Sequence, residues 1–519
     1  MAKYSEKWYN NLMFKTKKKT KILFVAPEVA PFAQVGGLGS AIHSLTRALA
    51  RLNYDVRVMM PRYATIDTSK FPMSSVYEAL EVPNNGSGPI ICNVKVHIPN
   101  IDDPTAPVIT YFLENQEYYE TRANVYGYAD DAVRWAILSK GALEFIRFYK
   151  EWRPDVVVAS DWQTGLIPNY LKTMYGNSKI MSDIATVFSI HNLSYQGMFD
   201  HRFVNEMDYD DGHSAVPEIN NPRLLKINMM RRGIMYADAI NTVSPTYAKE
   251  ITTPDRGELL DSLLQEKRSR LFGILNGIDH MAKNPESDQN IEFKYNAKNL
   301  KERAKNKKVL REKFNLPEAS DDIFTIGIVS RLSEQKGIDL LMETLPPLLD
   351  NFKFQLVVLG TGDAKYLSFF TELNKKYPNV ATHLSFDSVL PSFVFAGADA
   401  VLIPSKFEPC GLTQMEAMRY GAIPIVRKTG GLADSVEDYD PIRQKGTGFV
   451  FEKFDNYSLY GAVVRAIEMH KHPKNWQALQ RRAMLSDFSW DKSAKEYAKL
   501  FKKAIEFKKQ GNGEQGIVM

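Results

Sequence analysis

Two polar loops in the C-terminal half of the chain carry charged and hydroxyl side chains whose types and spacing could do chemistry. The first loop, Arg331 to Gly337, follows an apolar, β-rich run from Phe324 to Ser330 that is typical of a buried strand. Open α/β sheets bind their ligands beyond the carboxyl ends of the strands. Arg331 and Lys336 in such a loop would supply two cations close together, which suits a diphosphate.

The second loop, Glu408 to Gln414, follows another apolar strand pattern that ends at Pro404. It supplies a carboxylate and the hydroxyl of Thr413, where we expect a helix to begin whose first amides could hold phosphate. Because a carboxylate repels phosphate, we assign Glu408 to sugar hydroxyls. Ordinary surface charge is the alternative for the two cations of the first loop, but their occurrence together with Glu408 and Thr413 favours a nucleotide-sugar site.

A glycine-rich loop, Gln34 to Gly39, follows the first predicted strand of the N-terminal half. Adjacent Gly36 and Gly37 permit backbone conformations that expose amides to an anion. The spacing departs from the G-x-G-x-x-G pattern of dinucleotide-binding folds, and a tight turn without a ligand is the alternative. Glu28, upstream of the loop, could position it, contact an acceptor or be an ordinary surface carboxylate.

Two further polar clusters follow predicted strands. Asp161 and Trp162 come after the strand Asp155–Ala159. An aromatic ring beside a carboxylate suits a sugar, because apolar sugar faces stack on rings while hydroxyl groups seek acceptors; helix capping by Asp161 is the alternative. His191 follows the strand Ala185–Ile190. A lone histidine is more often structural, but its position at a strand end favours a functional role.

Composition and charge narrow the class of protein. The 519 residues are too many for one ordinary core, so we expect two domains. A net charge of only +5 argues against a dedicated nucleic-acid binder. Cys92 and Cys410 lie far apart without zinc or disulfide spacing, which fits a reducing compartment. There is no secretory apolar region and no run of ~18 apolar residues, so we expect a soluble cytoplasmic protein.

Strand and helix patterns alternate along the chain, which predicts two α/β domains with largely parallel sheets. A polar stretch from His280 to Asn315 separates the two series, which we expect to join near residues 276–284. The predicted strands are Lys21–Ala26, Asp55–Met59, Ile91–Ile98, Val108–Leu113, Asp155–Ala159, Ala185–Ile190, Phe324–Ser330, Gln355–Leu359, His383–Phe386, Ala400–Ile403 and Ala422–Val426. The clearest helical patterns are Ala41–Ala50, Asp131–Lys150, Pro222–Tyr236 and Asp491–Lys508.

The polar loops fall within a series of motifs that resembles the bacterial glycogen synthase and plant starch synthase family. The resemblance runs from about Lys21 to Leu500, with the motifs in the order that the family has. The motifs are Pro27–Pro31, Val35–Gly39, Ser160–Gln163, His191–Gly197, Tyr236–Asp238, Asn241–Tyr247, Gly273–Asp279, Arg331–Gly337, Glu408–Gln414 and Thr429–Asp434.

The resemblance implies the GT-B fold, an α/β architecture of two doubly wound, Rossmann-like domains facing a central cleft. It also implies a retaining glucosyltransferase that moves glucose from ADP-glucose, or sometimes UDP-glucose, to the non-reducing 4-hydroxyl of an α-1,4-glucan, with no cofactor or metal. The implied partners are the nucleotide sugar and the glucan, without nucleic acid or membrane. The sequence shows no acid/base pair or nucleophile of the kind that retaining hydrolases use, so a front-face substitution assisted by the departing phosphate fits.

The resemblance gives roles to matching positions. Among the implied catalytic residues, Arg331 and Lys336 would neutralise the donor diphosphate and Glu408 would hold glucose hydroxyls. His191 would lie by the transferred sugar, with its backbone near the anomeric carbon, and Asp161 would contact the reacting sugars. The implied donor-binding residues are Gln34, Gly36, Gly37, Asn276, Phe386 and Thr413.

Within this donor-binding set, the amides of Gly36 and Gly37 would face the phosphates and the glucose. Asn276 would line the cleft and Phe386 would stack on the base. Thr413 would contact the distal phosphate or the ribose.

Three positions depart from the family's pattern. Gln34 stands where the family usually has Lys, Ser40 where it has Asp, and Lys283 where it has an aromatic residue. A neutral amide in place of a charged donor would cost on the order of 1–3 kcal/mol if the Lys stabilises charge. A glucosyltransferase with another acceptor, a weakly active glucan-binding regulatory homologue and, more distantly, an oxidoreductase are therefore the alternatives.

The resemblance and the element pattern together predict the domain ranges. We expect a basic tail over residues 1–20, an N-terminal acceptor-side domain over 21–280 and a C-terminal nucleotide-sugar domain over 281–490. A last helix over 491–508 would return to the first domain, and residues 509–519 would form a tail.

Overall fold

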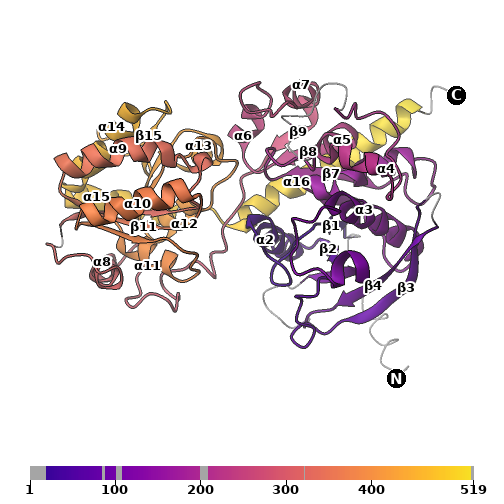
Figure 1. Cartoon of the computed structure of the whole chain (residues 1–519), viewed down its shortest axis with the longest axis horizontal. Coiled ribbons are helices and arrows are strands. Elements are labelled where there is room, and N and C mark those ends of the chain that lie inside the picture. The colour runs from indigo at the N-terminus through magenta and orange to yellow at the C-terminus, as the bar shows by residue number, and fades with distance from the viewer. Residues whose placement is uncertain are drawn as a thin grey trace. The chain divides into compact units, whose positions relative to one another are not determined.

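The chain folds into two compact units, whose elements are labelled in Figure 1. The computed structural model describes residues 19–84, 88–100, 108–198, 201, 209–320 and 322–515. The first unit comprises the residues up to Asn241, then Ile251–Phe272 and the residues from Ala494 onward; the second comprises Thr242–Glu250 and Gly273–Ser493. Both units are therefore assembled from separated stretches of the chain, and the predicted ranges differ from them in leaving Thr242–Glu250 within the N-terminal domain.

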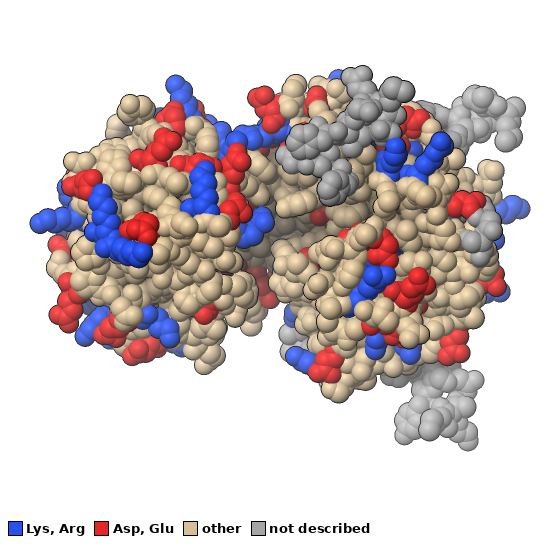
Figure 2. Space-filling view, in the orientation of Figure 1, with Lys and Arg blue, Asp and Glu red and all other residues tan. Residues whose placement is uncertain are grey.

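Parts of the sequence-based description fall beyond these residues. Lys15, Lys17 and Lys18 of the expected basic tail lie outside the described residues, as do residues 202–208 and 516–519. Within the described part of the chain, no helix is long and apolar enough to cross a membrane. On the face drawn in Figure 2, Lys and Arg are interspersed with Asp and Glu, as the nearly balanced composition leads one to expect.

The first unit has, among its described residues, a nine-stranded sheet with the order β3-β4-β5-β2-β1-β6-β7-β8-β9. Strands β5, β2, β1, β6 and β7 pair in parallel, whereas β3, β4 and β5 pair antiparallel. The central pairings confirm the largely parallel sheet. The strands are β1 (Lys21–Val25), β2 (Asp55–Pro61), β3 (Ser74–Val82), β4 (Ile90–His97), β5 (Ile109–Glu114), β6 (Val156–Ser160), β7 (Ala185–Ile190), β8 (Ala239–Thr242) and β9 (Leu271–Gly273).

Helices connect the strands of this unit, and the parallel strands with the most apolar sequences are deeply buried. Strands β6 and β7 have no exposed residue, as expected for parallel strands covered on both faces. The helices are α2 (Gly37–Arg51), η1 (Gln116–Glu120), α3 (Asp131–Phe148), η2 (Trp162–Thr164), α4 (Leu166–Thr173), η5 (Pro222–Lys226), α5 (Met229–Tyr236), α7 (Asp261–Glu266), η6 (Arg268–Arg270) and α16 (Trp490–Gln515), whose residues from Ala494 belong here.

The second unit has a six-stranded sheet among its described residues, with the order β12-β11-β10-β13-β14-β15. Every neighbouring pair is parallel, which confirms the prediction for this half of the chain. The strands are β10 (Phe324–Val329), β11 (Phe354–Leu359), β12 (Val380–His383), β13 (Ala400–Ile403), β14 (Ile423–Arg427) and β15 (Phe449–Phe451). The helices are α6 (Pro245–Glu250), α8 (Lys301–Lys313), η7 (Glu334–Lys336), α9 (Ile338–Asn351), α10 (Ala364–Lys376), α11 (Leu390–Gly397), α12 (Thr413–Arg419), α13 (Gly430–Ser435), α14 (Asn456–His470) and α15 (Pro473–Leu485).

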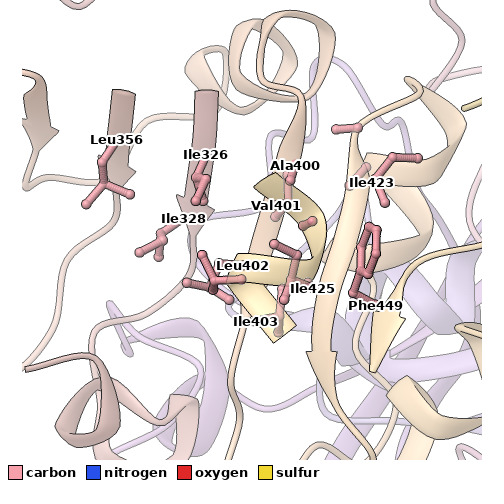
Figure 3. Close-up of a cluster of buried hydrophobic side chains, with 14 of the residues drawn as sticks. Ile326, Ile328, Leu356, Ala400, Val401, Leu402, Ile403, Ile423, Ile425 and Phe449 are labelled. Carbon is pink, nitrogen blue, oxygen red and sulfur yellow. The ribbon is translucent and has the colours of Figure 1, made fainter. Parts of the chain in front are cut away.

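The core of the second unit forms around the middle of its sheet. Figure 3 shows Ile326 and Ile328 of β10 beside Leu402 of β13 and Ile425 of β14, with their side chains in one apolar layer. These side chains are almost completely buried. β-Branched residues pack well on a pleated surface, so this layer holds the strand ends, and the loops that leave them, in fixed positions.

A buried charge cluster joins helix α8 to the start of strand β13. Asp399 accepts hydrogen bonds from the Lys307 ammonium at 2.6 Å and from the Thr325 amide at 2.9 Å, and His470 Nε2 lies 3.4 Å away. Burial raises the pKa of Asp399, but the Lys307 ammonium and His470 outweigh burial and hold that pKa below its usual value. The stability that this carboxylate contributes is therefore present above its unfolded pKa and is lost in acid.

We expect the substitution Asp399→Asn to lower the free energy of unfolding by about 3–5 kcal/mol, because it removes the buried carboxylate that pairs with the Lys307 ammonium at 2.6 Å and lies 3.4 Å from His470 Nε2. Urea denaturation followed by circular dichroism measures the change. Glu372→Gln is the control, since Glu372 and Lys375 form an exposed pair on α10, and such pairs contribute about 0–1 kcal/mol. Equal effects of the two substitutions would contradict the prediction.

Two predicted elements differ from the structure, and strand β3 was missed. The strand predicted at His383–Phe386 is wrong in its bounds, because β12 ends at His383 and Phe386 lies in the loop beyond. The helix predicted at Pro222–Tyr236 is interrupted: α5 begins at Met229, where the Asn228 side chain accepts a hydrogen bond from the amide of Arg231. Strand β3 was not predicted, because its register with β4 shifts twice and obscures the alternation of side chains.

Candidate active site

Each unit brings polar loops together where its strand order reverses. In the second unit, β10 pairs with β11 on one side and with β13 on the other. In the first unit, β1 pairs with β2 and with β6 in the same way. Ligands of open α/β sheets bind at the carboxyl ends of strands beside such reversals. A site is therefore expected at the loops that leave β10 and β13 in the second unit and β1 and β6 in the first.

In the second unit, the loops after β10 and β13 are joined by a charged pair. The Lys336 ammonium lies 2.6 Å from Glu408 Oε2, which also accepts a hydrogen bond from the Ser405 hydroxyl at 2.9 Å. Glu408 is 5% exposed, and its Oε1 accepts no hydrogen bond from a described residue. One carboxylate oxygen is thus fixed by the protein, while the other and two of the three Lys336 N–H donors stay available to a ligand.

The backbone holds this pair in place. Gly337, directly after Lys336, has φ 71°, and a Cβ there would lie 2.1 Å from the carbonyl oxygen of Pro404. Only glycine permits both the left-handed conformation and this close approach. The amide of Lys406 also donates to the carbonyl of Gln335 at 2.9 Å. The two loops therefore form one rigid structure.

A second pair of glycines supports the Glu408 loop from behind. A Cβ at Gly430 would lie 1.9 Å from the carbonyl oxygen of Glu408, and the Gly431 amide donates to that oxygen at 3.0 Å. Glu250 Oε1 in turn accepts hydrogen bonds from the Thr429 hydroxyl and the Gly430 amide, both at 3.0 Å. These glycines thus position Glu408, and the carboxylate of Glu250 positions the glycines.

The segment Thr242–Glu250 makes further contacts of this kind, which explains its place in the second unit. The Ser244 hydroxyl donates to the carbonyl of Pro409 at 2.7 Å, and the Thr246 amide and hydroxyl both donate to Asp434 at 2.7 Å. Sequence reasoning included these residues only as part of a motif and missed Glu250. No local pattern could have found it, because its partners lie far along the chain.

The other predicted residues of the second unit have varied surroundings. Arg331 is exposed, with one long hydrogen bond of 3.4 Å to Gln335, and Thr413 is half-buried at the start of α12, as predicted. Asn276 is 7% exposed and its Oδ1 finds no hydrogen-bond partner in the described structure. Phe386 is 85% exposed in the loop after β12. The structure does not bring Phe386 into direct contact with the Lys336–Glu408 pair.

In the first unit, a buried carboxylate holds the glycine-rich loop. Glu28 is 1% exposed and accepts hydrogen bonds from the amides of Val35, Gly36 and Gly39. Of the roles considered for Glu28, positioning the loop is therefore the one that the structure supports, and an ordinary surface carboxylate is wrong. The arrangement parallels that of Glu250 with its glycine pair in the second unit.

The glycine pair itself begins helix α2. Gly36 is the N-cap residue and has φ −130°, an ordinary extended conformation, so the special backbone geometry expected of these glycines is absent. The amide of Gly36 is directed at Glu28, whereas that of Gly37 has no acceptor among the described residues, and a Cβ at Gly37 would meet no atom within 4 Å. Gln34 is exposed beside the pair. Open space and an unused amide at a helix N-terminus fit an anionic ligand.

We expect Glu28→Ala to lower kcat/KM about 10–100-fold, because loop amides that lose their shared acceptor no longer hold one geometry. The free energy of unfolding should also fall by about 1–3 kcal/mol. Glu28→Gln keeps one acceptor oxygen and should recover part of the activity. Steady-state kinetics of both variants test this expectation, and full activity of a folded Glu28→Ala protein would contradict it.

Asp161 lies at the end of β6 in a strained backbone conformation. Its φ of 59° and ψ of −178° fall in a region that non-glycine residues rarely adopt. Its Oδ1 accepts a hydrogen bond from the His191 amide at 2.7 Å, and it makes no side-chain cap to the turn that follows. The helix-capping alternative is therefore wrong. The contact joins the loops after β6 and β7, which are parallel neighbours in the sheet.

The protonation states of these two residues are set mainly by burial. Burial raises the pKa of Asp161 to about 7, against the hydrogen bonds from the amides of His191 and Asn192, and the Glu28 charge raises it further. Burial lowers the pKa of His191 to about 4, so its imidazole is neutral at pH 7. The imidazole lies 3.3 Å from the Ser189 hydroxyl. His191 can thus exchange hydrogen bonds with a sugar without carrying charge.

Tyr126 is a residue of this region that sequence reasoning missed. It is half-buried, and burial together with the charges of Glu28 and Asp161 raises the pKa of its phenol. Its ring lies 5.9 Å from that of Trp135, which lies 6.3 Å from that of Trp162. Tyr126 thus lies close enough to Glu28 and Asp161 for both charges to act on its phenol. A tyrosine in a loop without periodicity gives no signal that sequence alone could use.

Comparisons with known proteins match both units to sugar-transferring enzymes. The family model described as "Starch synthase catalytic domain" matches residues 21–266, and the one described as "Glycosyl transferases group 1" matches residues 307–482. A glycogen synthase of Thermotoga petrophila is 40% identical over 491 residues, which cover 93% of this chain and 99% of the relative. A glycogen synthase of Moorella thermoacetica is 38% identical over 494 residues, which cover 94% and 98%.

Solved structures give the same result. The catalytic domain of Starch Synthase IV from Arabidopsis thaliana, bound to ADP and acarbose, has a TM-score of 0.80 and 30% identity, with 94% of this chain and 100% of that chain covered. Sucrose-phosphate synthase from Thermosynechococcus elongatus, at a TM-score of 0.56 and 16% identity, shares the fold alone. The two α/β units and their strand-end loops are those of a glycosyltransferase with the GT-B fold. Its sequence similarity over nearly the whole length shows that the chain belongs to the glycogen synthase and starch synthase family.

Proposed function

We propose that this protein transfers glucose, with retention of configuration, from ADP-glucose to the non-reducing 4-hydroxyl of an α-1,4-glucan. The observation that carries the proposal is the Lys336–Glu408 pair, which offers ammonium donors to a phosphate and a free carboxylate oxygen to sugar hydroxyls within one rigid structure. ADP is preferred to UDP as the leaving group because the related starch synthase was solved with ADP. The free thiols of Cys92 and Cys410 are consistent with activity in the cytoplasm.

The second unit would bind the donor. Arg331 and Lys336 would neutralise the diphosphate as negative charge develops on it, and Glu408 would orient the glucose through its hydroxyls. Thr413 would contact the distal phosphate or ribose, and Asn276 would line the sugar site. Phe386 would stack on the base, for which its exposed ring is well suited.

The first unit would act on the sugars. His191, neutral at pH 7, would lie beside the transferred glucose with its backbone near the anomeric carbon. Asp161 would contact the reacting sugars, and its ionised form would stabilise positive charge on the glucose in the transition state. The amides at Gly36 and Gly37 and the side chain of Gln34 would complete the contacts with phosphate and glucose.

The bond changes follow from these roles. The bond between the anomeric carbon and the β-phosphate oxygen breaks, and a bond from that carbon to the acceptor 4-oxygen forms on the same face. The proton of the 4-hydroxyl passes to the departing phosphate, and ADP leaves. The residues of the protein bind, orient and neutralise; none of them needs to form a covalent intermediate with glucose.

Transfer of labelled glucose into glycogen from ADP-glucose and from UDP-glucose tests the proposal. We expect kcat/KM to be higher with ADP-glucose, and the product to be shortened by an exo-acting α-1,4-glucosidase. Gln34→Lys, assayed alongside, should raise the rate by about 10-fold or more if a full charge there stabilises the departing phosphate, since 1.4 kcal/mol is tenfold. Binding of ADP-glucose without transfer to glycogen, in both proteins, would favour another acceptor or a regulatory role instead.

A further inference from the structure

A charged cavity lies in the first unit, away from the loops described above. It measures about 480 Å³ and is lined by Lys19, Thr20, Asp155, Asp183, Ile505, Lys508 and Lys509. Thr20 and Asp155 directly precede strands β1 and β6, and the amide of Lys21 donates to Asp155 Oδ2 at 2.8 Å. The cavity is therefore at the amino ends of strands whose carboxyl ends carry Glu28 and Asp161.

Lys508 is the residue in this cavity that needs explanation. It is 9% exposed, and its ammonium forms no hydrogen bond or ion pair with any residue that the structure describes. Burial lowers its pKa, and the neighbouring Lys172 lowers it further, whereas Asp238 and Asp183 raise it. Most of the Lys508 side chain is buried, and its ammonium has no ion-pair partner among the described residues, so an anion in the cavity would supply the counter-charge that the protein does not.

The nearby carboxylates of Asp238 and Asp155 have other partners and do not pair with the Lys508 ammonium. Asp238 accepts hydrogen bonds from the amide and hydroxyl of Thr186 and pairs with Lys172 at 3.3 Å. Asp155 is held by the amide of Lys21. Lys508 and Lys509 of helix α16 line the cavity together with Lys19. The space that these three lysines line is large enough for a small metabolite.

We propose that this cavity binds a small phosphate ester that carries hydroxyl groups. Lys19, Lys508 and Lys509 hold the phosphate, to which ammonium groups are well matched. Asp183 and the free oxygen of Asp155 accept hydrogen bonds from the hydroxyl groups of the ligand. Carboxylates repel a phosphate, so their presence in the cavity indicates a ligand that also carries hydroxyl groups. Because the cavity is at the opposite edge of the sheet from the strand-end loops, its ligand is an effector and not a substrate.

Isothermal titration calorimetry with ribose 5-phosphate, inorganic phosphate and ribose tests this site in the full-length protein with saturating ADP. ADP occupies the proposed donor site, so the measurement does not depend on transfer activity. We expect ribose 5-phosphate to bind more tightly than inorganic phosphate, and ribose not to bind. Failure of both phosphates to bind the wild type, or their displacement by ADP, would overturn the proposal.

The variant Lys508→Met removes the buried charge and keeps the shape of the side chain. We expect it to weaken binding of both phosphates about tenfold or more, and to raise the melting temperature of the unliganded protein. Lys499→Met is the matched control on the same helix, because Lys499 pairs with Glu496 at the surface. Unchanged binding by Lys508→Met, or a lower melting temperature, would show that Lys508 serves the fold and not a ligand.

The substitution Asp183→Asn distinguishes binding of the hydroxyl groups of the ligand from binding of its phosphate. It should reduce the preference for ribose 5-phosphate over inorganic phosphate while leaving phosphate binding in place. A preference equal to that of the wild type would overturn the assignment of Asp183 to hydroxyl groups.

Discussion

Replacement of Lys336 by methionine is expected to lower kcat for glucosyl transfer about 10²–10³-fold, the loss typical of one preorganised donor to a developing negative charge. The ammonium lies 2.6 Å from Glu408 and has two further N–H donors for the diphosphate. Methionine keeps the length of the side chain but removes every donor. Glu408 also loses a partner, so the sugar should be held less firmly and the KM for the donor should rise.

Two measurements distinguish this effect from damage to the fold. The control Lys365→Met removes a lysine that pairs with Asp339 between helices α9 and α10, at 2.5 Å, and should transfer glucose at the wild-type rate. Calorimetric titration with ADP should show weaker binding by Lys336→Met and unchanged binding by Lys365→Met. Wild-type kcat in a folded Lys336→Met protein would remove Lys336 from the donor site.

The substitution Asp161→Asn is expected to change activity and stability in opposite directions. Asp161 has a pKa of about 7 in the folded protein because burial disfavours its charge. Ionisation at neutral pH therefore costs folding free energy, and an amide that cannot ionise should raise the free energy of unfolding at pH 8 by about 1–3 kcal/mol. The lost charge near the reacting sugars should lower kcat about 10²-fold or more.

The free energy of unfolding and kcat should both depend on pH, in opposite directions. The folded carboxyl binds a proton more tightly than the unfolded one, so wild-type stability should fall as the pH rises from about 4 to about 7, whereas that of Asp161→Asn should not. The wild-type kcat should rise through pH 7 as Asp161 ionises. Urea denaturation and kinetics at several pH values measure these changes.

The control for Asp161 is an exposed aspartate of the same unit. Hydrogen bonds from Ser69 and Lys70 lower the pKa of Asp67, so Asp67→Asn should give no gain in stability and should keep wild-type activity. An Asp161→Asn protein that is no more stable than the wild type at pH 8, or one that is fully active, would contradict the assignment.

The proximity of Lys336 to Glu408 could be predicted from the sequence because strand order constrains it. Both residues follow apolar runs that make parallel strands, and such strands bring their carboxyl ends to one edge. The same rule explains why Asp161 and His191, which were predicted as two separate clusters, lie in contact, since their strands β6 and β7 are parallel neighbours. The carboxylates that hold the loops of the site in place cannot be predicted from the order of strands. Glu28 and Glu250 each hold a glycine pair through backbone amides, contacts that depend on loop conformations which no periodicity encodes.

The assignment of one segment, Thr242–Glu250, to the second unit was also beyond sequence reasoning. Apolar periodicity identifies elements but not which sheet each joins, so the segment Thr242–Glu250 could not be assigned to the second unit before Ser244, Thr246 and Glu250 were seen to contact it. The predicted strand at Phe386 was wrong for a different reason. An aromatic residue after an apolar run resembles the continuation of a strand, yet the strand ends at His383 and the ring is exposed.

The segmented first unit has a consequence for synthesis of the protein on the ribosome. Helix α16 contributes Phe501, whose ring packs against Phe24 of β1, and Tyr497, which accepts a hydrogen bond from Asn241. The 221 residues from Gly273 to Ser493 must be translated before these partners emerge, which takes roughly 10–45 s at bacterial and eukaryotic elongation rates. During that interval the nascent sheet lacks part of its cover, so the growing chain is most exposed to chaperones and proteases before its last helix arrives.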